Sequence, residues 1–320
     1  MRNRIKKIQG WLAASIMMLA AMSCSSSNEE TTPLEPTTMP SKVVIYIPES
    51  TMQVNAATRA EGGFALRGVA EVYDPLGECV KHLSVMLTPT AQQDVYSFDL
   101  NDLSNGDYDI YVWADYSQDG GDTYYNTESL RGVTYKQDVV HNASDSKVRR
   151  AYFGKTALSP SSQTQPVKAK SPFAHYRIEA IDVDRYESMK NVNGWPELEE
   201  LQIRVTYNSF VPTSFNILTG KPNDAETGVK YTANTFERKD GKVLVGDDFV
   251  FVTGEKSSVN ITVELVNPAN DEVISSIEDL RVDYREGYVT IVSGDFLTHY
   301  PHSDDVNVDV RWEGEYNVEF

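Results

Sequence analysis

Short apolar segments separated by turn-forming residues recur along almost the whole chain after residue 40. Val43–Ile47 is a β-branched run bounded by proline on both sides, and Tyr108, Ile110 and Val112 alternate with other residues. Turn residues interrupt such runs at intervals of roughly 8–12 residues, the spacing typical of β-sandwiches and barrels. Long stretches with helical periodicity are scarce. The sequence therefore predicts an all-β fold.

The strongest change in composition within this β-rich part lies at Ser159–Pro172, which holds four serines, three prolines and two lysines. This segment could be an interdomain linker or the two arms of a loose hairpin. With a linker there, the most economical arrangement is two tandem antiparallel β-sandwich domains, over residues 41–165 and 166–320.

Three local features can be predicted as well. Asp240-Gly241 favours the positive φ angles of a tight hairpin, so Arg238–Lys242 is expected to be a turn. Thr127–Val133 and Val183–Asn191 could each form a short turn of helix. Cys79 stands at the start of an expected strand, Glu78–Leu87, and we interpret it as a small core residue.

Residues 1–23 have the organisation of an export signal. Four basic residues precede an apolar run from Trp11 to Met22, which is well short of the ~20 residues that a helix needs to cross a bilayer. After Cys24 the chain turns polar and rich in Thr and Pro. A cysteine at this junction resembles the lipid-modified first residue of a bacterial lipoprotein. We therefore expect acylation (palmitate) on Cys24 and a flexible tether over residues 24–40; the alternative is an ordinary signal peptide with an incidental cysteine.

The chain is strongly acidic, with a formal net charge of −18. Four of its cations precede Cys24, so the remainder is more acidic still. Such a chain is repelled by nucleic acid, which excludes nucleic-acid binding. No nucleophile elbow, phosphate-binding loop or dinucleotide fingerprint occurs in the sequence. We therefore expect a protein that is not an enzyme and has no cofactor, apart from the calcium considered next.

One acidic segment has the spacing of a calcium loop. Asp115, Ser117 and Asp119 place oxygen side chains at positions 1, 3 and 5, and Gly120 follows. The carboxylate expected at position 12 is instead Asn126. The sequence therefore offers two interpretations: a calcium site, or an exposed Asp/Gly turn, which is the favoured one.

Aromatic residues gather in the same sector. Trp113, Tyr116, Tyr124 and Tyr125 could form a platform on which a sugar ring stacks. Such residues more often bury their rings in a sandwich core and keep a hydroxyl in water, which is the favoured alternative.

Five short motifs occur in a fixed order. They are L-R-G-V-A-E-V-Y-D from residue 66, Y-V-W-A-D-Y from 111, Y-Y-N-T-E-S-L from 124, R-A-Y-F-G from 150 and P-F-A from 172. Together with the lipoprotein-like start and the strand from Tyr288 to Thr298, they resemble the fimbrillin-like (Mfa-like) proteins, surface lipoproteins related to type V pilus subunits.

This resemblance implies two transthyretin-like sandwiches of Greek-key type and assembly by strand exchange. In the pilus subunits a protease cuts after an arginine that follows the first strand, and a strand from the next subunit fills the groove that opens. Arg59 stands at the corresponding place here; the alternative is a plain loop arginine. The implied role is a structural, accessory or anchoring pilus subunit in adhesion.

The implied partners are other pilus subunits or surface proteins, with outer-membrane lipid holding Cys24. The implied location is the surface side of the outer membrane, or the fimbrium if the chain assembles. A second hypothesis is a surface glycan-binding lipoprotein for nutrient capture, which depends on the aromatic sector around Trp113.

Overall fold

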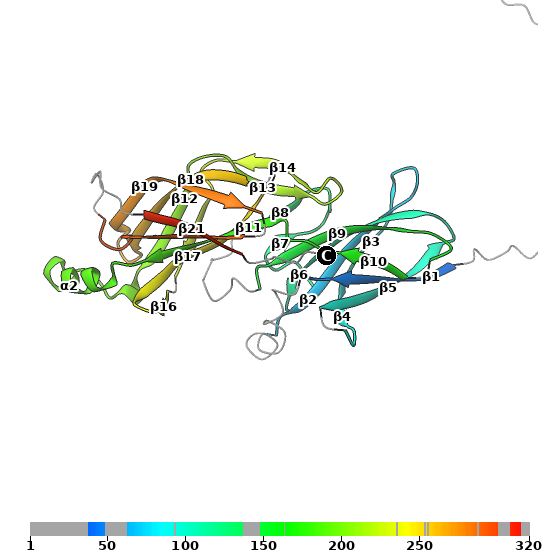
Figure 1. Ribbon diagram of the computed structural model, residues 1–320, viewed down its shortest axis with the longest axis horizontal. Helices are drawn as coiled ribbons and strands as arrows, with labels where there is room; N and C mark the ends of the chain where they lie inside the picture. Colours follow the sequence, from blue (N-terminus) through cyan, green and yellow to red (C-terminus); the bar gives the residue numbers. More distant parts are fainter. Residues whose placement is uncertain are drawn as a thin grey trace, which may run out of the picture. The chain divides into compact units, whose positions relative to one another are not determined.

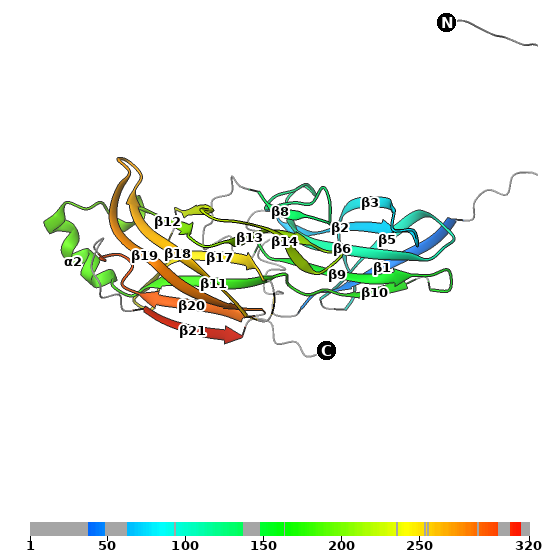
Figure 2. The ribbon, with the colours of Figure 1, turned by 90° about the horizontal axis from the view of Figure 1, so that it is seen from above.

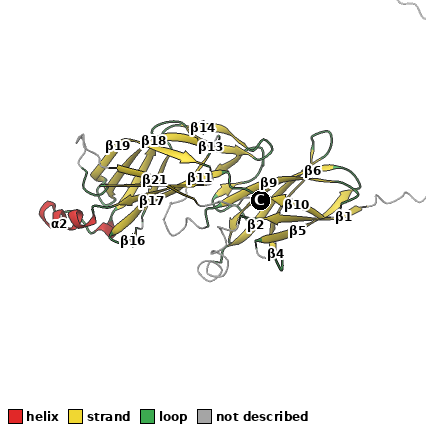
Figure 3. Cartoon of the chain, viewed as in Figure 1, coloured by secondary structure: helices red, strands yellow, loops and turns green. Residues whose placement is uncertain are grey.

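The computed structural model describes residues 38–48, 63–136 and 148–314, except positions 93, 163, 235, 253, 255, 287 and 300–307. The described residues belong to one compact unit built mostly of strands (Figure 1; Figure 3), which confirms the all-β prediction. Within this described part, α2 (Val183–Asn193) is the single α-helix, and no helix there is long and apolar enough to span a bilayer.

Two four-stranded sheets contribute to a first hydrophobic core. One sheet has the order β10-β1-β5-β4 and the other β3-β2-β6-β9. Fully buried side chains from both sheets, such as Ile45 of β1 and Val72 of β2, pack in one cluster. The strands, drawn in Figures 1 and 2, are β1 (Thr38–Tyr46), β2 (Ala65–Tyr73), β3 (Cys79–Met86), β4 (Thr88–Pro89), β5 (Val95–Ser104), β6 (Tyr108–Ser117), β9 (Ala151–Leu158) and β10 (Thr164–Lys168).

A second core lies between a five-stranded sheet, β16-β17-β11-β20-β21, and a four-stranded sheet, β15-β12-β18-β19. Burial alternates along β12, as it does in a strand with one face toward a core. The strands are β11 (Phe173–Ala180), β12 (Gln202–Tyr207), β15 (Lys230–Ala233), β16 (Glu237–Lys239), β17 (Lys242–Phe251), β18 (Lys256–Asn267), β19 (Glu272–Arg285), β20 (Tyr288–Gly294) and β21 (Val308–Gly314).

A fifth sheet, also of four strands, has the order β14-β13-β8-β7. Its strands are β7 (Tyr125–Asn126), β8 (Val133–Tyr135), β13 (Val211–Asn216) and β14 (Lys221–Glu226). Next to it is an aromatic cluster that includes Trp113 of β6, Phe173 of β11, Phe215 of β13 and Phe251 of β17. This cluster therefore joins strands that belong to both cores.

The sheets are antiparallel at every described pairing except two. β1 pairs with β10 and β11 pairs with β20 in parallel. The predicted antiparallel sheets are therefore confirmed, apart from these two pairings. Parallel neighbours need long crossover connections, and adjacent runs of sequence give no sign of such pairings.

Ser159–Pro172 is part of the first pair of sheets. β10 lies within this segment and pairs with β1 from Lys42 to Tyr46, and Lys170 forms an isolated antiparallel bridge to Phe153 of β9. The structure is therefore nearer to the hairpin alternative than to a free linker. The expected domain boundary between residues 165 and 166 falls inside β10, and the division into two domains stays a prediction.

Local turn chemistry is confirmed where it was most specific. Asp240 and Gly241 have φ angles of 52° and 76° at the turn between β16 and β17. The helix expected at Val183–Asn191 is α2, which ends at Gly194 in the left-handed region. Thr127–Val133 is not helical and instead carries the turn between β7 and β8.

Candidate functional site

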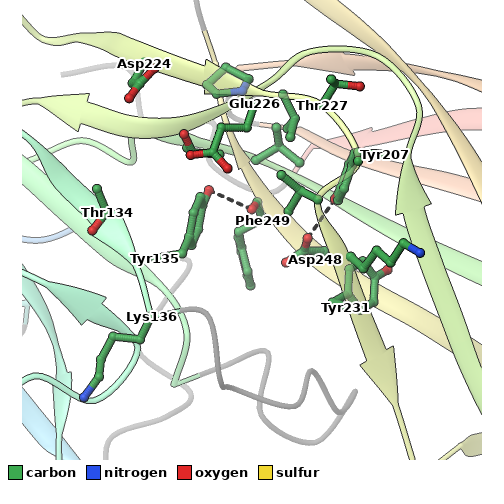
Figure 4. A pocket seen from close by; sticks show the side chains of 17 residues that line it. Thr134, Tyr135, Lys136, Tyr207, Asp224, Glu226, Thr227, Tyr231, Asp248 and Phe249 are labelled. Atoms are coloured by element: carbon green, nitrogen blue, oxygen red, sulfur yellow. Dashed lines mark hydrogen bonds between the residues drawn. The ribbon is translucent and has the colours of Figure 1, made fainter.

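A cavity of about 700 Å³ opens between β8, β13, β14, β15 and β17 (Figure 4). This volume is within the roughly 300–1,000 Å³ typical of ligand pockets. Aromatic and acidic side chains make up much of the lining: Tyr135, Tyr207, Tyr231, Phe249, Asp224, Glu226 and Asp248. Asp248 and Phe249 are buried, whereas Asp224 and Glu226 are exposed at the rim. The cavity therefore combines a fixed, dry floor with an acidic entrance.

The floor is fixed by a buried ion-pair cluster at the middle of β17. Arg149 Nη1 donates to Asp248 Oδ1 at 3.0 Å, and its Nη2 lies 3.3 Å from Asp247 Oδ1. His175 Nε2 lies 2.9 Å from the same Asp247 oxygen. Burial lowers the pKa of Arg149, but Asp248 and Asp247 outweigh this effect and raise it above its ordinary value. Arg149 is therefore a permanent cation that balances Asp248.

Three tyrosine hydroxyls extend this cluster. Tyr207 Oη donates to Asp248 Oδ2 at 2.7 Å, and Tyr176 Oη lies 2.9 Å from Tyr207 Oη and 2.8 Å from Tyr231 Oη. Burial, together with the charge of Asp248, raises the pKa of Tyr207 and of Tyr231 well above the ordinary value. These hydroxyls therefore stay protonated, and Tyr207 acts as a donor toward Asp248.

Side chains occupy the edge of β17 that faces the cavity. β16 pairs with β17 only at Lys242–Leu244. Beyond that point Arg149 Nη2 donates to the carbonyl of Asp247, and Tyr135 Oη donates to the carbonyl of Phe249 at 2.9 Å. These bonds satisfy carbonyls that a neighbouring strand would otherwise pair, so the cavity lies beside a protected strand edge.

The predicted sugar platform is wrong as a surface feature. Trp113, Tyr125 and Tyr116 are 0%, 2% and 6% exposed. Trp113 packs edge-on against Tyr125 and Phe173, with ring centroids 5.2 and 6.3 Å away. Tyr124 is half-buried and stacks on Phe64. The rings therefore fill the core, as the favoured alternative predicted, because β6 is an interior strand covered by neighbours on both sides.

The acidic loop after β6 is organised around an arginine. Asp115 accepts hydrogen bonds from Arg67 Nε at 2.8 Å and Nη2 at 2.7 Å, and Asp122 accepts one from Arg67 Nη1 at 2.7 Å. Ser117 Oγ donates to the carbonyl of Gly121. The positive charge beside these carboxylates is thus a guanidinium from β2.

The expected calcium ligands, Asp115, Ser117 and Asp119, therefore have partners of their own. Asp119 Oδ1 accepts the backbone N–H of Gly121 at 2.9 Å. In the part of the chain that the structure describes, no group of three or more His, Cys, Asp or Glu side chains could hold a metal ion. The geometry of the loop gives the calcium interpretation no support.

Burial acts differently on the two carboxylates bonded to Arg67. Burial raises the pKa of Asp115 above its ordinary value, although Arg67 opposes this effect. Burial also acts to raise the pKa of Asp122. The hydrogen bonds that this carboxylate accepts from Thr127 and Arg67 act in the opposite direction and outweigh burial, so the pKa of Asp122 is lowered. Of the two carboxylates bonded to Arg67, Asp122 is therefore the one whose ionised form stabilises the fold.

A family model of unknown function, DUF6562, matches residues 36–320. The chain belongs to this family. No curated protein sequence matches this member of DUF6562.

Solved structures similar to this DUF6562 protein include proteins of fimbriae. The fimbrial anchor protein Mfa2 from Porphyromonas gingivalis is 10% identical, with 86% of this chain and 98% of that chain covered and a TM-score of 0.43. A fimbrial assembly protein from Parabacteroides distasonis is 12% identical, with 87% and 99% covered and a TM-score of 0.41.

Two predicted processing residues, Cys24 and Arg59, lie outside the described residues. Cys79, expected in the core, is instead exposed at the start of β3, because β3 is an edge strand whose first residues follow a surface turn. Burial of its thiol still raises the pKa of Cys79, and the charge of Glu71 adds to this effect.

The buried charges Arg67, Arg149 and Asp248 were not identified from the sequence. A signal for two of them was present. Arg67 and Asp248 both stand inside mostly apolar strands, and a charge in such a position needs a buried partner.

Proposed function

We propose that this DUF6562 protein is a cell-surface lipoprotein of fimbrillin-like type that anchors or accompanies other pilus or surface proteins in adhesion. In this proposal, lipid on Cys24 holds the protein in the outer membrane and residues 24–37 form the tether, since β1 begins at Thr38. The protein works by contact and carries out no chemical reaction.

The observation that carries the proposal is the position of β1. This strand directly follows the proposed tether and lies inside its sheet, between β10 and β5. Five of its residues pair with β10 and eight pair with β5. Val43 and Ile45 are fully buried in the first core. The strand whose removal would open a groove for assembly is thus an integral part of this fold.

This position suits an anchor for a mechanical reason. The tether joins β1 at its first residue, Thr38, so a pull on the tether is carried by the hydrogen bonds of β1 to β10 and β5. The buried side chains of β1 must also leave the core before the strand can slide. A subunit that keeps β1 and its lipid can therefore hold a load at the membrane.

The glycan-binding alternative loses its original basis. It depended on exposed rings around Trp113, and that side chain is fully buried. We therefore favour the anchoring or accessory role.

Mass spectrometry of the native protein, isolated from its own membranes, tests the proposal. We expect an N-terminus at an acylated Cys24 with β1 still attached. As a matched control, Cys24→Ala should remove the lipid and release the protein from the membrane fraction without changing its thermal unfolding.

Two results would contradict the anchoring role. An unacylated protein would remove the proposed attachment. A mature chain that begins at Ala60, and that Arg59→Ala restores to the uncut form, would instead identify a subunit that loses β1 and polymerises.

A further inference from the structure

The cavity beside β17 has no role in the anchoring function proposed above, and its charges point to a specific ligand chemistry. Two lysines, Lys136 and Lys230, also belong to its lining. Lys136 Nζ donates to the carbonyl of Asp122 at 2.9 Å, and Figure 4 shows this side chain directed away from the cavity. Lys230 neighbours Tyr231 on β15, and adjacent strand residues point to opposite faces. Because Tyr231 points into the core, Lys230 points away from it.

The acidic groups are not all balanced. Asp248 is paired with Arg149 and bonded to Tyr207, so the floor contributes little net charge. Glu226 differs: among the described residues, no basic group forms an ion pair with it. Figure 4 shows its carboxylate directed toward the hydroxyl of Tyr135. Asp224 lies two residues before it on β14 and is also exposed. The opening is therefore negative.

Aromatic rings surround this negative opening. Tyr135 is half-buried, and its inner side packs on Phe251 with ring centroids 4.7 Å apart. Tyr207 and Tyr231 line the opposite part of the cavity. Ring faces attract cations that approach within about 6 Å, and a carboxylate at the same place adds an ion pair. The hydroxyl network fixes these rings before any ligand arrives, so little ordering is required on binding.

We propose that this cavity binds a cationic nitrogen group of the lysine or arginine type, with Glu226 as the ion-pair partner and Tyr135 as the aromatic wall. Two sources could supply this chemistry: a side chain of an extended peptide segment, or a free small amine. The proposal is independent of the anchoring function, since neither Cys24 nor β1 contributes to the cavity.

Isothermal titration calorimetry on the purified full-length protein tests the proposal. The probes are N-acetyl-lysine amide, N-acetyl-arginine amide, and N-acetyl-norleucine amide, which lacks the charge. A lysine-containing pentapeptide and spermidine distinguish the two sources. We expect the charged probes to bind, and the norleucine probe to bind with an affinity at least roughly tenfold lower. Higher salt should lower the affinity of the charged probes.

Glu226→Gln keeps the size of the side chain and removes its charge. We expect this variant to bind the lysine probe with an affinity lower by roughly tenfold or more. The matched control is Glu278→Gln, an equally exposed carboxylate on β19, away from the cavity lining, which should leave binding unchanged. Unchanged thermal unfolding of Glu226→Gln would show that the fold is kept.

Three outcomes would overturn the proposal. The first is equal binding of the lysine and norleucine probes. The second is no effect of Glu226→Gln on a probe that binds. The third is that no cationic probe binds at millimolar concentration. If maltose or N-acetylglucosamine then binds in a Glu226-dependent way, the cavity is a sugar site instead.

Discussion

Removing the guanidinium of Arg149 should destabilise this protein strongly. Arg149 is fully enclosed, contacts two carboxylates and one backbone carbonyl of β17, and lies against the ring of Phe249. Its partners are almost 100 residues away along the chain. In the Arg149→Ala variant, Asp248 and Asp247 would remain buried next to an empty space.

The size of the effect follows from what each carboxylate keeps. Removing one partner of a buried ion pair typically costs about 3–5 kcal/mol, because the other charge is left unpaired. Here Asp247 keeps His175 and Arg177, whose Nε lies 3.5 Å from Asp247 Oδ2, and Asp248 keeps the Tyr207 hydroxyl. We therefore expect a loss near the lower end, about 3 kcal/mol of unfolding free energy.

Urea unfolding followed by circular dichroism measures this loss as a lower midpoint at unchanged slope. In an Asp248→Asn background the same substitution should cost at least about 1 kcal/mol less, since the main unpaired charge is gone. Arg281→Ala is the matched control. Arg281 pairs with Asp283 on the surface and is 69% exposed, so its removal should change stability by less than about 1 kcal/mol.

The reasoning would be refuted by a loss below about 1 kcal/mol for Arg149→Ala, or by an equal loss in the Asp248→Asn background. Either result would mean that the ion pair between Arg149 and Asp248 contributes less to the unfolding free energy than its geometry indicates.

Three further substitutions test other parts of the fold. Gly154→Ala should lower the unfolding free energy by about 1–3 kcal/mol, because a Cβ there would lie 2.5 Å from Val167, whereas Gly254→Ala meets open space and should be nearly neutral in the same urea assay. Ile45→Ala should cost about 2–5 kcal/mol, since the side chain is fully buried in the first core; a loss below this range would mean that β1 is dispensable for the core. Asp122→Asn should destabilise at neutral pH, because the folded pKa of this carboxyl is lowered. The stability that the ionised Asp122 contributes is present above the unfolded pKa of about 3.9 and is lost as pH falls through the folded pKa. The melting temperatures of wild type and variant should therefore become equal at low pH in thermal melts. A difference in melting temperature that persists at low pH would contradict a lowered pKa of Asp122.

Elements defined by local chemistry could be predicted from the sequence. The strand from Tyr108 shows its period of two in the residues themselves, and Asp240-Gly241 takes the positive φ angles that these residue types favour. The glycines of two recognised motifs, Gly68 and Gly154, are explained only by the structure. A Cβ at Gly68 would lie 2.6 Å from Leu87, so close packing excludes a side chain there.

The candidate site could not be predicted because its parts come from distant segments. Tyr135 ends β8, Glu226 ends β14, and Asp248 lies in β17; each is unremarkable among its sequence neighbours. The sequence did show acidic and aromatic residues in abundance. It did not show which of them a second strand would cover, and Trp113 was for that reason considered for the surface although it is buried.

The sequence by itself determined the strand character of the chain, its tight hairpin at residues 238–242 and its acidic surface. These properties depend on each residue and its nearest neighbours, so they can be worked out locally. Only the tertiary structure decided which charges are buried and paired, which rings form a core and where a cavity opens. Those properties depend on which strands meet, and strand pairing is fixed by the packing of the whole chain rather than by any one segment.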